Sequence, residues 1–232
     1  MEFETTVAEI IRRNSEVKSF RFRRPASFQF LPGQFLMVTI RINGEKKTKY
    51  FSISSSPTES EYIEFTKRIT SHEFSKALDN LQVGETVYLN GPHGKFTFTG
   101  EYQKVVMIAG GIGITPFMSM IGYCTDNRIP AAITLLYGNR SEESAAFKEE
   151  LANFMQKNRN LRIVHSLSRP EETWKGRRGH LDLTTIREEV PDYQDASFYL
   201  CGPPALVEDL ERVLQAEGIP EDRVYVESFL GY

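Results

Sequence analysis

The spacing of hydrophobic and polar residues changes after about the first hundred of the 232 residues in this chain. Before that point, apolar and polar positions alternate over short segments, as in residues 19–23. Alternation with period two is typical of antiparallel strands that bury one face, and the intervening glycine and proline turns indicate short connections. The pattern predicts a six-stranded antiparallel barrel with one short helix. The segments that we delimit are strands at 19–23, 34–42, 50–54, 62–68 and 86–90 and a helix at 74–81.

After residue 100, apolar runs alternate with helical segments. Buried strands that alternate with helices are typical of a parallel sheet with right-handed crossovers. We therefore expect a barrel domain at residues 1–99, followed by a Rossmann-like parallel α/β domain at residues 100–232. The expected strands are 105–109, 132–137, 161–166, 197–200 and 223–226, and the expected helices are 116–125, 142–157, 183–189 and 204–216, with a loop at 169–179.

A glycine-rich segment follows the first apolar run of this second half. Gly110, Gly111 and Gly113 permit a close approach of the backbone to a ligand, because they carry no side chain. Thr115 is expected to cap the next helix and Pro116 to occupy its first position. Because the unpaired N–H groups at the start of a helix attract anions, the segment predicts a phosphate site.

A second segment of this kind follows the expected strand at 197–200. Cys201, Gly202 and Pro203 form the turn, and the expected helix at 204–216 comes next. Ligands of open α/β sheets bind outside the carboxyl ends of the strands, so both turns are expected at one cleft. Together the two turns predict a site for a pyridine dinucleotide.

The composition excludes several other classes of protein. Hydrophobic residues make up 40% and charged residues 25% of the chain, which is ordinary for a soluble globular protein. No apolar run approaches the ~20 residues of a membrane span, and the acidic N-terminus lacks the features of a signal peptide, so a cytoplasmic protein without membrane contact is expected. Cys124 and Cys201 form no C-x-x-C pair and the four histidines are scattered. This argues against an iron–sulfur centre, a disulfide framework or a metal site.

Charge is distributed unevenly along the chain. Residues 1–99 hold 14 Lys and Arg against 11 Asp and Glu, whereas residues 100–232 hold 14 against 20. The basic excess is either a solvated rim or a docking face for an acidic partner or for phosphates. Its density is too low for a nucleic-acid-binding patch.

Five motifs, in this order and spacing, resemble the ferredoxin–NADP reductase superfamily. Lys49 to Pro57 is similar to its Arg-x-Tyr-Ser flavin motif, and Gly91-Pro92-His93-Gly94-Lys95-Phe96 to the motif that closes its barrel. The remaining three match its nucleotide domain and are Gly110-Gly111-Ile112-Gly113-Ile114-Thr115-Pro116, Tyr137-Gly138-Asn139-Arg140-Ser141 and Cys201-Gly202-Pro203-Pro204. The resemblance covers essentially the whole chain and implies an FAD-binding barrel followed by an NAD(P)-binding domain.

On the flavin side, the resemblance gives three residues a specific role. It implies that Phe51 lies against the flavin ring, where stacking contributes about 0.5–1.5 kcal/mol. Ser52 would hydrogen-bond near N5, the flavin atom that takes the hydride, and Lys49 would neutralise the flavin phosphate. The other flavin-binding residues that it implies are Tyr50, Ile53, Thr66, Lys67 and Ser75.

Three positions depart from the family pattern. Lys49 replaces an arginine and lacks its bidentate fork, Phe51 replaces a tyrosine and lacks the hydroxyl, and His72 replaces a glycine before the expected helix. FAD is still favoured over FMN, but we expect a flavin that dissociates easily.

On the nucleotide side, the resemblance implies that Cys201 lies beside the nicotinamide C4 and that Thr115 contacts the same ring. A lone cysteine at a strand end is equally well interpreted as a small buried apolar residue. The other nucleotide-binding residues that the resemblance implies are Gly110, Gly111, Gly113, Pro116, Asn139, Arg140, Ser141, Gly202 and Pro203.

Arg140 bears on the choice between NADPH and NADH. It follows the expected strand at 132–137, where an arginine pairs with a 2′-phosphate and favours NADPH. It could equally be a surface residue, because Glu142 and Glu143 would repel a phosphate and Phe147 stands where NADPH-specific relatives often have tyrosine. The balance favours NADPH.

The C-terminus resembles the Glu-x-aromatic ending of plant-type members. Glu227 would lie near flavin N5, and Phe229 or Tyr232 would cover the flavin face that the nicotinamide must reach. The alternative is a strand that packs Phe229 between the domains.

The predicted function is that of an FAD-dependent NAD(P)H oxidoreductase. It would pass a hydride from nicotinamide to flavin, with Ser52, Cys201 and Glu227 at the reacting atoms, and then pass electrons to a separate acceptor. Ferredoxin or flavodoxin is the favoured acceptor, because both are usually acidic and residues 1–99 are basic. The alternatives are an NAD(P)H:flavin reductase that uses free flavin, the flavin subunit of a larger complex, and an idle nucleotide-binding module.

Overall fold

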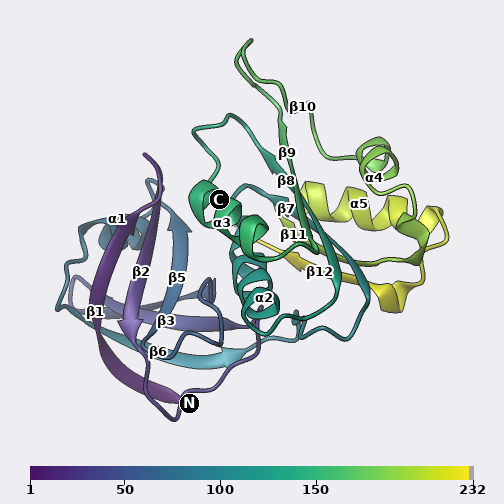
Figure 1. Ribbon diagram of the computed structural model, residues 1–232. Helices are drawn as coiled ribbons and strands as arrows, with labels where there is room; N and C mark the ends of the chain where they lie inside the picture. The colour runs from purple at the N-terminus through teal and green to yellow at the C-terminus, as the bar shows by residue number, and fades with distance from the viewer. Residues whose placement is uncertain (230–232) are drawn as a thin grey trace. The chain divides into compact units, whose positions relative to one another are not determined.

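The computed structural model describes residues 1–229 and divides the chain into two compact units (Figure 1). The barrel unit comprises Met1–Thr99 and Thr115–Tyr123. The α/β unit comprises Gly100–Ile114 and the chain from Cys124 onward. The barrel unit therefore includes nine residues that follow the glycine-rich segment in sequence.

The barrel unit is built on one six-stranded sheet in the order β4-β3-β6-β1-β2-β5, in which every neighbouring pair is antiparallel. An antiparallel bridge between Ile53 and Phe65 joins the chain that leaves β4 to β5, so the two ends of the sheet meet. The predicted antiparallel architecture is confirmed. The elements are β1 (Glu2–Arg12), β2 (Val17–Arg23), β3 (Phe35–Ile42), β4 (Glu45–Ser52), β5 (Tyr62–Arg68), α1 (Glu73–Asn80) and β6 (Thr86–His93).

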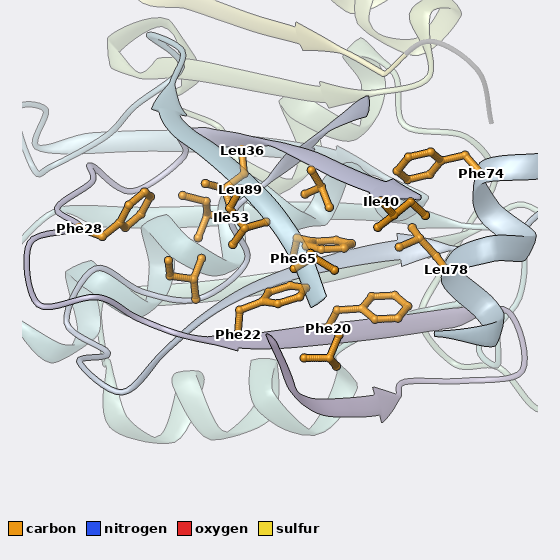
Figure 2. Close-up of a cluster of buried hydrophobic side chains, with 14 of the residues drawn as sticks. Phe20, Phe22, Phe28, Leu36, Ile40, Ile53, Phe65, Phe74, Leu78 and Leu89 are labelled. Carbon is orange, nitrogen blue, oxygen red and sulfur yellow. The ribbon is translucent and has the colours of Figure 1, made fainter. Parts of the chain in front are cut away.

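Aromatic side chains fill the interior of the barrel unit (Figure 2). The ring of Phe65 on β5 stacks on Phe20 and Phe22 of β2, with centroids 5.2 and 5.5 Å apart. Leu78 of α1 is fully buried in the same cluster. Because alternate residues of each strand point inward, the period-two pattern of the sequence corresponds to this core.

The α/β unit carries a parallel sheet in the order β10-β9-β8-β7-β11-β12, as predicted. The chain runs outward from β7 to β10 and then crosses back to β11, so the order reverses between β7 and β11. Helices α4 and α5 cover one face of the sheet and α3 the other (Figure 1). The elements are β7 (Lys104–Gly110), α2 (Thr115–Asp126), β8 (Ala132–Asn139), α3 (Lys148–Lys157), β9 (Leu161–Leu167), β10 (Arg177–Arg178), α4 (Leu183–Glu189), β11 (Ser197–Gly202), α5 (Pro204–Ala216) and β12 (Val224–Ser228).

The main differences from the sequence predictions concern β1, α3 and β10, and β4 begins at Glu45 rather than at residue 50. β1 was not delimited, because a register shift between Val7 and Glu9 interrupts its alternation and Val7 is its one fully buried residue. Helix α3 begins at Lys148 rather than at 142, because Phe147 is buried in the left-handed region (φ +61°) and ends any right-handed helix there. The expected loop at 169–179 contains the short strand β10.

Within residues 1–229, no helix is long and apolar enough to cross a membrane.

Candidate functional site

The two predicted turns meet where the order of the parallel sheet reverses. β7 and β11 are neighbours, and Ala109 lies opposite Cys201 in their register. A Cβ atom added to Gly113 would lie 2.4 Å from the carbonyl oxygen of Cys201 and 2.7 Å from the Cα of Gly202. A Cβ atom on Gly110 would lie 2.8 Å from the ring of Pro203. Glycine is therefore required for the two backbone segments to touch.

The start of helix α2 differs from the prediction. A 3₁₀ turn over Gly111–Ile114 runs directly into α2, so Thr115 is the first helical residue and not the cap. Gly111 has φ +54°, a value that glycine adopts without strain. The helical run, and with it the N–H groups available to an anion, begins at Gly111, five residues before the predicted first helical position at Pro116. Pro116 follows within the first turn of the helix proper.

Cys201 and Glu227 lie opposite each other across β11 and β12. Cys201 is completely buried, and its burial, followed by the charge of Glu227, raises the pKa of its thiol well above the usual value. The thiol is therefore neutral and is not a thiolate nucleophile. The N–H of Phe229 donates to the carbonyl of Gly202 at 2.9 Å, so the chain after β12 runs beside this turn. Tyr232 lies outside the described residues.

Polar residues gather at the carboxyl ends of β8 and β9. Asn139 is 8% exposed, and neither its Oδ1 nor its Nδ2 has a hydrogen-bond partner among the described residues. Arg140 is exposed, and its carbonyl accepts a hydrogen bond of 2.8 Å from the N–H of Arg169. The N–H of Ser141 donates to Ser144 Oγ in a local turn.

Arg169 is a further candidate that no sequence motif singled out. Its position in the sequence could have identified it. Arg169 comes shortly after β9, as Arg140 comes directly after β8, and adjacent parallel strands end at the same edge of a sheet.

The flavin motif occupies β4 and the chain that follows it. Lys49 and Phe51 pair with Val38 and Leu36 of β3, and Lys49 is exposed whereas Phe51 is partly buried. The ring of Phe51 stacks on Phe65, with centroids 4.6 Å apart and an angle of 16° between the planes. One face of the Phe51 ring is therefore already covered by the barrel core.

Tyr50 and Ser52 lie on the opposite face of β4. Tyr50 is 64% exposed and contacts Phe35 edge-on, whereas Ser52 is buried. Ile53, which follows β4, is fully buried in the core. On β5, the hydroxyl of Thr66 lies 2.9 Å from that of Ser54.

Three basic residues of β4 and β5, Lys49, Lys67 and Arg68, are close enough for their charges to interact. Burial, followed by the charges of Arg68 and Lys49, lowers the pKa of Lys67 below its usual 10.5. Arg68 Nε and Thr70 Oγ1 are buried without a hydrogen-bond partner, although Glu16 lies 3.7 Å from Arg68 Nε. A cationic site with unpaired donors is suited to a phosphate.

The beginning of α1 is close to these residues in the chain. Its N-cap, His72, makes no side-chain hydrogen bond to the first turn. Ser75 Oγ accepts from the N–H of Thr70 at 2.7 Å and is buried, so this hydroxyl holds the chain between β5 and α1. Glu73 places a carboxylate in the first turn, which opposes an anion there.

Two family descriptions match the chain. Residues 3–98 match the family described as an oxidoreductase FAD-binding domain, and residues 107–212 match the oxidoreductase NAD-binding domain.

Curated relatives extend over most of the chain. It is 31% identical over 230 residues to the glycine betaine monooxygenase reductase subunit of Chromohalobacter salexigens, with 95% of this chain and 62% of the relative covered. It is 30% identical over 243 residues to NADH-cytochrome b5 reductase 1 of Candida glabrata, with 97% of this chain and 85% of the relative covered. The chain thus spans less than two thirds of the first relative and most of the second.

Solved structures share the fold at lower identity. The cytochrome b5 reductase domain of Ulva prolifera nitrate reductase superposes with a TM-score of 0.87 at 22% identity, covering 98% of this chain and 97% of that one. A ferredoxin NADP+ reductase from Neisseria gonorrhoeae with bound FAD and NADP superposes with a TM-score of 0.83 at 19% identity, covering 98% of both chains.

The contact at Gly113 makes a prediction about stability. Gly113→Ala should lower the free energy of unfolding by about 1–3 kcal/mol, because the added methyl meets a backbone carbonyl that has no room to move. Gly138→Ala is the matched control, since the nearest atom there is the flexible Leu181 side chain at 3.1 Å. Urea unfolding of both variants measures the difference, and equal losses would contradict the prediction.

Proposed function

The chain belongs to the ferredoxin–NADP reductase superfamily, and from that premise we propose that it is an FAD-dependent NAD(P)H oxidoreductase that passes electrons to a separate acceptor. The barrel unit would hold the flavin, and the carboxyl edge of the parallel sheet would hold the nucleotide.

The observation that carries this proposal is the location of the buried polar atoms that have no hydrogen-bond partner. Across residues 1–229, the buried side-chain nitrogen and oxygen atoms without a hydrogen bond are Arg68 Nε, Thr70 Oγ1 and both amide atoms of Asn139. An unpaired buried polar atom costs about 1–3 kcal/mol, so each of them calls for an explanation. All belong to the two places at which the sequence motifs suggest flavin phosphate and nucleotide, and these ligands would supply the missing partners.

The residues around β4, β5 and α1 fit a flavin with phosphate groups. When bound, FAD supplies the ring system that accepts a hydride from nicotinamide and releases electrons onward. Lys49, Lys67 and Arg68 would neutralise the phosphates, and the first turn of α1 would add N–H donors. Phe51 would offer its remaining ring face for stacking, and Ser52 would donate a hydrogen bond to the ring.

The residues around β7, β8 and β11 fit a dinucleotide. The helical run from Gly111 would receive the pyrophosphate, and the Asn139 amide, with one donor group and one acceptor, would bind the adenosine part. Cys201, as a neutral thiol, would give the nicotinamide an apolar wall. Glu227 would hold a proton or a hydrogen bond close to the reacting atoms.

For the acceptor, we propose a small acidic redox protein such as ferredoxin or flavodoxin, because residues 1–99 carry the basic excess of the chain. The names of the relatives support other acceptors as well. One is the reductase subunit of a monooxygenase and another is a reductase of cytochrome b5. All of these place the acceptor in another molecule or domain.

The second candidate function is an NAD(P)H:flavin reductase, in which flavin is a substrate. Lysine in place of arginine at position 49 and the Glu73 carboxylate in the first turn of α1 both favour weak flavin binding.

The visible spectrum of the purified protein tests the proposal directly. We expect a flavin band that bleaches when NADPH or NADH is added without oxygen, because bound flavin then accepts the hydride. A colourless protein that oxidises NAD(P)H only with free flavin would support the flavin reductase instead. A protein that shows neither behaviour would overturn both functions.

Flavin affinity should depend on Lys67. Lys67→Met should weaken FAD binding by about tenfold or more, since a charge-assisted contact to phosphate contributes about 1.5–3 kcal/mol. Bound phosphate favours charged lysine, so wild-type affinity should fall as pH rises through the lowered pKa that Lys67 has in the flavin-free protein. Fluorescence titration measures both effects, with exposed Lys76→Met of α1 as the control. The same pH dependence in Lys67→Met would contradict this role.

The choice of nucleotide should depend on Arg140. We propose that Arg140, with Arg169 beside it in the backbone, pairs with the 2′-phosphate of NADPH. Arg140→Ala should then raise the KM for NADPH by about tenfold and leave that for NADH within about twofold. Steady-state kinetics with both nucleotides measure this, and equal changes would reject the pairing in favour of NADH.

A further inference from the structure

A buried carboxylate lies next to the flavin strand and has no part in the site as described so far. Glu64 of β5 is 3% exposed. Arg13 Nη2 donates to it at 3.0 Å and Arg21 Nε at 2.8 Å. A buried charge is tolerated only when it is paired and hydrogen-bonded, and two guanidinium groups fulfil this condition.

The same residue holds the chain that follows β4. The N–H of Ser54 donates to the Glu64 carbonyl at 2.8 Å, and Ser54 Oγ donates to the carboxylate at 2.9 Å. The N–H of Glu64 in turn donates to Ser55 Oγ at 3.0 Å. These bonds fix Ser54 and Ser55, two and three residues after Ser52.

Hydroxyl groups extend the network across the sheet. Thr66 Oγ1 lies 2.9 Å from Ser54 Oγ and 2.6 Å from Ser19 Oγ. Arg13 Nε donates to Ser19 Oγ at 2.8 Å, which leads back to the arginine that binds Glu64. The bonds form a closed circuit, so that its members are held by more than one partner.

The network also reaches helix α2. Ser119 Oγ donates to the carbonyl of Ser55 at 2.7 Å, and both residues are buried. Ser119 lies four residues after Thr115, one turn into α2, within the stretch that belongs to the barrel unit. The rings of Phe117 and Phe96, 5.8 Å apart, pack this stretch further.

We propose that Glu64 is a positioning residue that keeps the Ser52 hydroxyl and the first turns of α2 in a fixed relation. Through Ser54 and Ser55 it fixes the segment that carries Ser52, and through Ser119 it ties that segment to the helix whose start receives the nucleotide. The inference rests on the proposed function. Displacement of a reacting group by about 1 Å costs up to about 10²-fold in rate, so such a tie has a kinetic value beyond stability.

The bonding pattern distinguishes this role from a contribution to stability alone. Well-packed apolar residues often stabilise a fold as well as a buried ion pair does. Here the Glu64 carboxylate accepts a hydrogen bond from Ser54, its backbone carbonyl accepts one from the N–H of Ser54, and its N–H donates one to Ser55. An apolar residue at position 64 would keep only the two backbone bonds.

The test compares Glu64→Gln with Glu9→Gln. Both changes remove a carboxylate that binds Arg21, but the Glu9 side chain lies on β1 and is 53% exposed, whereas Glu64 binds Ser54 directly. In the flavin-free protein, amide hydrogen exchange of residues 52–57 should accelerate by about tenfold or more in Glu64→Gln only. In the flavin-loaded protein, the stopped-flow rate of flavin reduction should fall by about tenfold or more with an unchanged nucleotide KM.

Ser119→Ala is the second variant, in case Glu64→Gln does not fold. It should leave FAD affinity within about twofold of wild type and slow flavin reduction by about threefold to tenfold. Unchanged exchange at 52–57 in Glu64→Gln, or unchanged reduction rates in Ser119→Ala, would overturn the proposal. If the wild type takes up no flavin, the proposed function fails, and the exchange measurement still decides whether Glu64 holds the segment.

Discussion

The architecture of the α/β unit depends on a backbone contact that leaves no room for side chains. The carbonyl of Cys201 occupies the place where any residue other than glycine at 113 would put its Cβ atom. This contact brings the two turns together at the point where the sheet order reverses, the usual ligand position in open α/β folds. It also leaves Cys201 buried, which keeps its thiol neutral. The chemistry available at this edge therefore follows from how closely the backbone packs.

The period of the hydrophobic pattern predicted both sheets, because burial on one face or on two leaves a direct trace in the sequence. The prediction was wrong where the local backbone conformation interrupts a regular element without changing the hydrophobic pattern. The register shift after Val7 hid β1, and the left-handed conformation of Phe147 delayed α3. At Gly111–Ile114 the sequence suggested an open turn, whereas the chain already winds into a 3₁₀ turn. In each case, the conformation of a few residues decides whether a regular element is interrupted or extended.

The sequence motifs pointed to individual candidate residues of the site, but not to the contacts that hold them in place. Lys49, Ser52, Asn139 and Arg140 stand out because of neighbouring residues in the sequence. Glu64 does not, because a glutamate at an alternating position of a strand is ordinarily interpreted as facing water. Its partners Arg13 and Arg21 are 51 and 43 residues away in the chain. Residues so far apart in the chain leave no local sequence pattern, so their hydrogen-bond network is visible only in the folded structure.

The division of the chain has a consequence for its synthesis. The barrel unit takes Thr115–Tyr123 from beyond the start of the α/β unit, and its strand β1 pairs with β6, more than eighty residues later. No single cut of the polypeptide would separate the two units intact. Residues 115–123 must therefore leave the ribosome before Ser119 can bond to Ser55 and Phe117 can pack on Phe96. Each unit has its own sheet, but the barrel unit cannot complete its fold before part of the chain beyond residue 114 has been synthesised.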